Sequence, residues 1–123
     1  MRRTILLSAA ALLLAGRAFA ATLDTAPISA TFGHERYLIC LVQNTSPQPK
    51  TVTMSVLNFS GSPVVGPLKY TVEAGQSQSI AANPVPGAAS CRFVVAGSAN
   101  SVHASASYYD PDTNRSEIAL PAE

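Results

Sequence analysis

The residue types that most often carry chemistry are scarce in this chain and lie far apart. The 123 residues include only two histidines, His34 and His103. Nucleophilic catalysis needs a base beside a serine or cysteine, yet His34 lies in a Gly-His-Glu turn and His103 on the serine-bearing face of an alternating segment. The sequence has no Gly-x-Ser-x-Gly motif and no glycine-rich loop before a helix. We therefore expect a protein that is not an enzyme and binds no cofactor.

One acidic segment is similar to the start of a calcium-binding loop. Asp110, Asp112 and Asn114 alternate, as the first oxygen ligands of such a loop do. Arg115 then stands where that loop needs glycine, and Pro121 stands where it needs the closing glutamate. We interpret the segment as a polar hairpin turn and expect no metal site.

The two cysteines, Cys40 and Cys91, lie in separate alternating segments. Neither belongs to a Cys-x-x-Cys motif or lies near a histidine in sequence, which disfavours a redox or metal-binding role. In an oxidising compartment such a pair becomes a disulfide. We expect a bridge between two sheets that contributes roughly 4 kcal/mol to stability by closing a long loop.

The N-terminus has the layout of a secretory signal peptide. The pair Arg2-Arg3 precedes an apolar run from Ile5 to Ala15, and Ala18 and Ala20 supply the small residues of a cleavage site. The run is shorter than the roughly 20 residues that span a bilayer, so we expect no stable membrane insertion. The pattern predicts cleavage after Ala20 and a periplasmic or secreted product. It leaves open whether export uses the general secretory or the twin-arginine route.

Removal of residues 1–20 would leave one domain, residues 21–123, which is long enough for a single hydrophobic core. Three of the eight Lys and Arg residues lie in the signal peptide, so five cations face seven Asp and Glu, a formal net charge of about −2. Nucleic-acid binding normally shows a clustered basic patch. Nucleic acid is not an expected partner, because the remaining cations are scattered singly: Arg36, Lys50, Lys69, Arg92 and Arg115.

Apolar residues recur with period two almost throughout the expected domain, and no stretch carries a sustained helical stripe. Strands are predicted over residues 28–32, 35–43, 50–59, 68–72, 76–81, 91–95, 102–108 and 118–120. Seven or eight short strands separated by turn residues are typical of a single antiparallel β-sandwich. The fold class predicted is therefore all-β.

The turns suggest how these strands connect. Ala74-Gly75 predicts a hairpin into a polar edge strand at 76–81, and segments 91–95 and 102–108 are expected to form a second hairpin. The apolar parity switches close to Asn58, which indicates a bulge or a change of covering layer there.

Several of these features together resemble the immunoglobulin-like sandwiches of small exported bacterial proteins. They are Cys40 in an early apolar strand, Val42-x-Asn44 at its end, the Val72–Gly75 turn and Cys91 before a further apolar strand. The chain departs from immunoglobulin domains proper in having no Trp, and in having Ala89 where those domains place a tyrosine. The resemblance implies an immunoglobulin-like architecture of seven to eight strands and leaves function open, because such folds host many functions.

Three Asn-x-Ser segments, beginning at Asn44, Asn58 and Asn114, match the acceptor pattern for N-glycosylation. We interpret the matches as coincidental, because the signal peptide has bacterial character. The first lies in the cluster Asn44–Pro49, which predicts a turn, since Asn and Ser bond their own backbone.

Two kinds of surface could bind a partner. Tyr108 and Tyr109 stand beside a turn, where paired aromatic residues can form a sugar-binding or protein-binding edge. Alternation requires one of the two to face the core. Rigid loops at Ser62–Pro67 and Asn83–Gly87 are a second candidate, because they would lose little entropy on docking. The prolines concerned are Pro63, Pro84 and Pro86.

The leading hypothesis is a non-catalytic exported protein that mediates protein–protein interaction in the periplasm or at the cell surface, as an accessory or structural subunit. Its motivation is export, a Ser/Thr-rich surface and polar strand edges that could accept a strand from a protein of the cell envelope. The alternative is a secreted inhibitor or ligand-binding module that uses the proline-rich loops. The identity of the partner and the oligomeric state stay open.

Overall fold

The computed structural model describes residues 19–29, 37–83, 87–110 and 115–123, with the backbone alone at 115–120. Within these residues the chain forms nine strands and no helix. The all-β prediction is confirmed. The strands are β1 (Ala20–Asp24), β2 (Ile28–Ser29), β3 (Tyr37–Asn44), β4 (Lys50–Asn58), β5 (Pro63–Val72), β6 (Ser77–Ala82), β7 (Ala88–Ala96), β8 (Val102–Asp110) and β9 (Arg115–Pro121).

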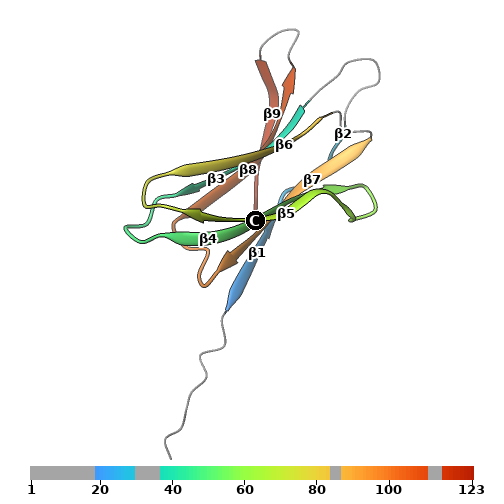
Figure 1. The fold of residues 1–123 in the computed structure, drawn as a ribbon. Helices are drawn as coiled ribbons and strands as arrows, with labels where there is room; N and C mark the ends of the chain where they lie inside the picture. The colour runs from blue at the N-terminus through green and yellow to red at the C-terminus, as the bar shows by residue number, and fades with distance from the viewer. Residues whose placement is uncertain (1–18, 30–36, 84–86, 111–114) are drawn as a thin grey trace, which may run out of the picture.

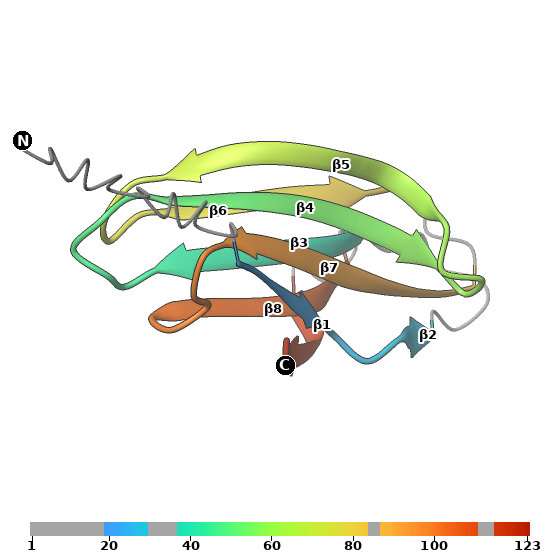
Figure 2. The same cartoon turned by 90° about the horizontal axis from the view of Figure 1, so that it is seen from below.

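The strands make two antiparallel sheets that lie face to face, the layered arrangement of a β-sandwich (Figure 1). Sheet A has the order β1-β7-β4-β5, with the short β2 also paired to β7, and sheet B has the order β6-β3-β8-β9. Figure 2 looks onto sheet A, with strands of sheet B behind it. Strands that follow one another in sequence thus often lie in different sheets.

The core forms where the two sheets meet. Successive side chains of a strand point to opposite faces, so in β3 Leu38 and Val42 are fully buried while Leu41 is exposed. Burying a side chain of this size contributes about 1.5–3 kcal/mol. Both sheets contribute to one cluster, which includes Val52, Met54, Val56, Phe93, Val95, Ala104, Ala106 and Tyr108.

The predicted strands match observed ones, with differences at their ends, but β1 is an addition. Its only large apolar residue is Leu23, which is half-buried between the exposed Thr22 and Asp24. So short and polar a segment gives a weak alternation signal. β1 nevertheless pairs along its whole length with β7, from Ala20↔Ala96 to Asp24↔Arg92.

Both predicted hairpins are wrong. β5 and β6 belong to different sheets, and so do β7 and β8, so the turns at Ala74-Gly75 and before Val102 carry the chain from one sheet to the other. The consecutive strands that do pair are β4 with β5 and β8 with β9. Alternation shows which face of a strand is buried, and it does not show which neighbour supplies the hydrogen bonds.

The predicted irregularity near Asn58 lies in the pairing of β4 with β5. The register shifts twice, between Met54 and Leu57, because β5 carries extra residues at this point. Gly66 lies in the bulge with φ of 81°. A Cβ there would lie 2.5 Å from the backbone oxygen of Met54, so this position requires glycine. The expected loop Ser62–Pro67 is therefore wrong, since β5 begins at Pro63.

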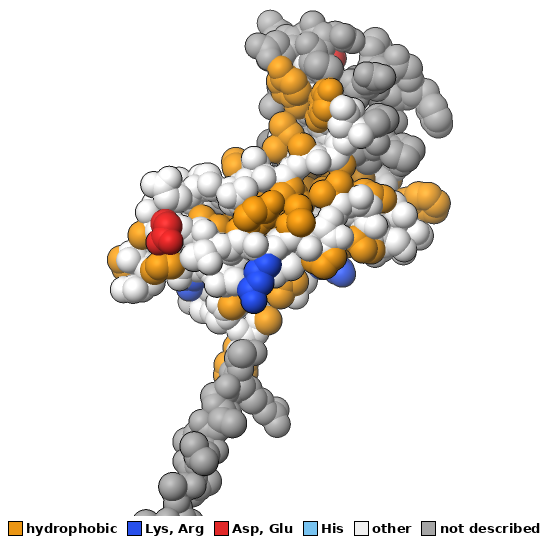
Figure 3. All heavy atoms as spheres, in the orientation of Figure 1, with side chains coloured by type: hydrophobic (Ala, Val, Ile, Leu, Met, Phe, Trp, Pro, Cys, Tyr) orange, Lys and Arg blue, Asp and Glu red, His pale blue; other side chains and the backbone are white. Residues whose placement is uncertain are grey.

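One side of the sandwich carries an edge strand of each sheet, β5 of sheet A and β6 of sheet B. β5 pairs only with β4, and β6 pairs only with β3, within the residues that the structure describes. Hydrophobic side chains form a band between β6 and β5 on this side of the molecule (Figure 3). We call the side of the molecule that carries β5 and β6 the open side.

Candidate interaction surface

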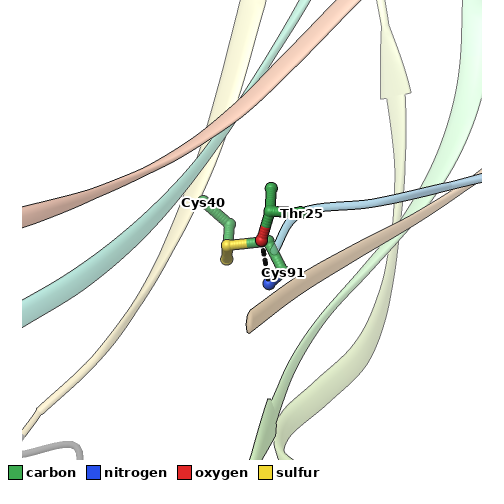
Figure 4. The surroundings of a disulfide bond; sticks show 3 residues. All are labelled: Thr25, Cys40 and Cys91. Carbon is green, nitrogen blue, oxygen red and sulfur yellow. Dashed lines mark hydrogen bonds between the residues drawn. A yellow bond between two sulfur atoms is a disulfide. The ribbon is translucent and has the colours of Figure 1, made fainter. Parts of the chain in front are cut away.

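The disulfide is present, and both of its cysteines belong to the buried core cluster (Figure 4). Cys40 of β3 and Cys91 of β7 are bonded with their Cα atoms 5.7 Å apart, and both side chains are fully buried. Because β3 belongs to sheet B and β7 to sheet A, the bond links the two sheets, as predicted. Its enclosure by the core indicates a structural role.

Thr25 fastens the segment between β1 and β2 to the chain at this bond. Its hydroxyl accepts a hydrogen bond from the Cys91 amide at 2.9 Å, and its own amide donates to the Cys91 carbonyl at 3.0 Å (Figure 4). Thr25 is buried, so these bonds satisfy polar groups that water does not reach. The N-terminal strands are thereby held to the strand that carries the disulfide.

The residues considered for catalysis and metal binding do not converge in the part of the chain that the structure describes. His103 is exposed on the outer face of sheet B. His34, Asp112 and Asn114 lie outside the described residues. Within the described ranges no group of three His, Cys, Asp or Glu could hold a metal ion.

A search of the same residues for a helix long and apolar enough to cross a membrane finds none.

The tyrosine pair is divided between the two faces of sheet B. Tyr108 is buried, and its hydroxyl donates a hydrogen bond to the carbonyl of Ile28 at 2.8 Å. Tyr109 lies on the outer face, where its ring packs against Tyr37 with ring centroids 6.4 Å apart and planes tilted by 48°. Tyr108 therefore fixes β2 to β8 and is not available to a partner, whereas Tyr109 is half-buried beside Tyr37.

The other residues of the predicted surface are spread over the molecule. Pro63 is exposed as the first residue of β5, while Pro84 and Pro86 lie outside the described residues. Of the expected cleavage-site residues, Ala20 is the first residue of β1, and Ala18 also lies outside the described residues.

Asn44 is a buried polar residue at one end of the open side. It forms hydrogen bonds with the turn after β3, with the end of β5 and with the turn between β5 and β6. Its side-chain nitrogen donates to the carbonyls of Gln48 at 2.7 Å and Val72 at 3.0 Å, and its side-chain oxygen accepts from the amide and hydroxyl of Ser46. Its backbone bonds Gln76 and Gly75 in the turn between β5 and β6. Asn44 thereby ties the end of β3 to the turn where β5 and β6 meet.

Asn58 ends β4 with the same local motif on the surface. Its side-chain oxygen accepts hydrogen bonds from the amide and hydroxyl of Ser60 and from the amide of Ser62. In both Asn-x-Ser segments the asparagine side-chain oxygen thus accepts hydrogen bonds from the serine two residues later, which is the turn chemistry predicted for Asn44. These hydrogen bonds give both Asn-x-Ser segments a structural role as turns. Asn44 is in addition only 1% exposed.

The side of the molecule opposite the open side is closed by hydrogen bonds. The Asp24 amide of β1 donates to the Glu123 carbonyl at 3.0 Å, and the Glu123 amide donates back at 3.3 Å. The Ala122 amide donates to the Ala104 carbonyl of β8 at 2.8 Å. The residues after β9 therefore bond to both sheets. We call this the closed side.

A salt bridge adds to the closed side. The Arg92 guanidinium holds both carboxylate oxygens of Asp24, at 2.8 and 3.1 Å. Hydrogen bonding to Asp24 and the charge of Asp24 raise the pKa of Arg92 further above its ordinary value, so the guanidinium stays charged at every physiological pH. Both side chains are 44% exposed, which limits the pair's contribution to stability.

The open side exposes apolar residues on the inner face of β5. Leu68 is 40% exposed, while Val65 and Tyr70 are half-buried and pack against the core cluster. We call these three residues the apolar strip. Their alternation predicts core positions, but β5 and β6 diverge from their shared turn, so no strand covers this stretch in the described residues.

The two edges of the open side have opposite properties. β5 contains Pro63 and Pro67, which have no amide to donate, and its pairing is interrupted by the bulge at Gly66. β6 has no proline and no charged residue, and it pairs with β3 without a register shift from Leu38↔Ala82 to Gln43↔Ser77. Natural edge strands are usually protected by charges, prolines or bulges. β5 has all three of these protections, because it also carries the exposed Lys69, and β6 has none.

Comparison of the chain with known protein families, with curated proteins and with solved structures gives no match.

Proposed function

We propose that the protein is a non-catalytic exported module that binds another protein of the cell envelope, in the periplasm or at the cell surface, through its open side. The observation that carries the proposal is the unprotected edge of β6 beside the apolar strip of Val65, Leu68 and Tyr70. An exposed strand edge next to apolar side chains can accept a further strand, which provides main-chain hydrogen bonds and side-chain pockets together.

Export is proposed from the N-terminal pattern of residues 1–20. Cleavage after Ala20 would leave Ala21–Asp24 free to pair with β7, as it does in the structure. The disulfide supports an oxidising compartment, since such bonds persist outside the cytosol.

The strand order supports an immunoglobulin-like variant with exchanged outer strands. In an immunoglobulin domain the disulfide joins strands B and F, B pairs in the sheet that contains A and E, and F pairs in the sheet that contains C and G. Here β3, β4, β6 and β7 take the roles of B, C, E and F. The first strand, β1, pairs with the F-like β7, and β8 lies beside the B-like β3 with β9 beyond it, which reverses the usual places of the outer strands.

The alternative of an inhibitor that presents two proline-rich loops loses support, because Ser62–Pro67 runs into strand β5 and pairs with β4. We therefore retain the interaction module.

The test is a cross-linked pull-down of the tagged full-length chain from its native envelope, read by mass spectrometry. The proposal expects one stoichiometric envelope partner. Recovery of the protein alone under several growth conditions would reject the proposal, and recovery of a foreign protease would favour an inhibitor.

A further inference from the structure

We propose that β6 binds an extended, uncharged segment of about six residues from the partner protein, in the antiparallel direction that every described strand pair has, with apolar side chains at alternate positions. This inference rests on the proposed function and specifies the chemistry of the partner. It assigns the main-chain contacts to β6 and the side-chain contacts to the apolar strip.

The assignment to β6 follows from the available backbone. A strand that adds to a sheet needs a regular row of amides and carbonyls. Pro63, Pro67 and the bulge at Gly66 break this row on β5, whereas Ser77–Ala82 is regular against β3. The outward side chains of β6 are Ser77, Ser79 and Ala81, all small and exposed, so they leave an approaching strand unobstructed.

The alternation of the bound segment follows from the two faces of β6. An added strand continues the pleat of sheet B, so every second side chain would point inward toward the other sheet. There it would meet the apolar strip on β5, where Leu68 is 40% exposed. The intervening side chains would point outward beside Ser79 and Ala81 and would be polar or small.

The charge of the segment follows from its surroundings. No charged residue belongs to β6 or to the apolar strip, so a charge buried against them would lose its hydration without gaining an opposite charge. Glu73 is exposed in the turn just before β6. An antiparallel segment ends near Ser77, so a Lys or Arg immediately after its apolar stretch would lie near Glu73.

A second copy of this chain is the less suitable occupant. Pairing β6 with its own copy would make a contact about 20 Å long and about 10 Å wide, which buries about 400 Å² in total, far less than the about 1,200 Å² of stable interfaces. It would also leave the apolar strip uncovered, because Ile80 and Ala82 of the copy are already buried in their own core. A free segment can bury its own side chains against the strip.

The experiment selects from a display library of random ten-residue peptides on the full-length, oxidised protein. We expect enriched peptides with six uncharged, alternately apolar residues followed by Lys or Arg. Ser79→Lys should weaken their binding by at least about tenfold, because a charge would stand on the paired edge. Thr71→Lys is the matched control, since Thr71 is also exposed but lies on β5, and it should leave affinity unchanged.

Two further variants test the side chains. Leu68→Ser should weaken binding several-fold by removing an apolar contact, and Glu73→Gln should reduce the preference for a terminal Lys or Arg. Unchanged urea unfolding midpoints establish that the variants fold. If Ser79→Lys does not fold, Ala81→Lys replaces it on the same exposed face of β6.

The inference is overturned if no peptide is enriched, if enriched peptides lack alternation, or if they bind Ser79→Lys as tightly as the original protein. A concentration-dependent dimer in sedimentation that Ser79→Lys abolishes would assign the edge to a second copy instead. An envelope partner captured equally by the original protein and by Ser79→Lys would reject the β6 assignment while leaving the proposed function intact. Peptide binding without any envelope partner would reject only the proposed function.

Discussion

The two sides of the sandwich use their strand edges in opposite ways. On the closed side, β1 and the residues after β9 exchange backbone hydrogen bonds between Asp24 and Glu123, and a salt bridge joins Asp24 to Arg92. On the open side, β5 and β6 separate after a shared turn and leave Leu68 exposed. The difference shows that the fold does not require an uncovered edge, because the same chain closes its other side with its own C-terminal residues.

The largest expected effect tests whether the closed side can hold the sheets together alone. Replacing both cysteines, Cys40→Ala with Cys91→Ala, removes the covalent link and should lower the free energy of unfolding by about 4 kcal/mol. That is a large share of the about 5–15 kcal/mol of a small domain. Urea unfolding with and without reductant measures it. Coincident curves for the oxidised and reduced protein would mean that hydrogen bonds and packing suffice.

The next effect tests the anchor of the open side. Asn44→Ala should destabilise the protein by about 2–4 kcal/mol, because the carbonyl of Val72 would lose its donor in a buried setting and the carbonyl of Gln48 in a partly buried one. Asn58→Ala is the matched control, since it removes the same motif from an exposed turn and should cost less than about 1 kcal/mol. Equal losses, measured by urea unfolding, would show that Asn44 has no special role in holding the β5–β6 turn.

The smallest effect opens the closed side. Ending the chain after Pro121 removes the hydrogen bonds of Ala122 and Glu123 and should lower the free energy of unfolding by about 1–2 kcal/mol. Hydrogen exchange at the Asp24 amide should accelerate, which mass spectrometry of peptides from β1 can detect. Glu123→Ala keeps the backbone and should behave like the original protein. If it matched the truncated protein, the closed side would depend on the side chain and not on the main chain.

The sequence predicts faces better than it predicts neighbours. Alternation correctly assigns Val52, Met54 and Phe93 to the core, and the sparse cysteines correctly predict the disulfide. The turns before β6 and β8 are composed like hairpin turns, but they carry the chain across to the other sheet. Turn residues indicate that the chain reverses direction, and the packing of the whole core determines which strand pairs with which.

The candidate surface was the harder part to predict, for a related reason. Tyr108 and Tyr109 are conspicuous in sequence, yet one is in the core and the other packs against Tyr37. Leu68 and Tyr70 look like ordinary core positions, but Leu68 is exposed and Tyr70 only half-buried because β6 turns away from β5. Exposure of this kind arises because no described strand covers the inner face of β5, and the local sequence of β5 cannot show whether another strand will cover it.

The way the chain moves between the two layers has a consequence for how the molecule is made. The central strands of sheet A are β4 and β7, and those of sheet B are β3 and β8, so a cut between β4 and β7 leaves neither fragment with the centre of a sheet complete. We therefore expect that neither of these fragments folds alone. Folding has to wait until β8 has been synthesised, and unfolding should then proceed as a single cooperative event.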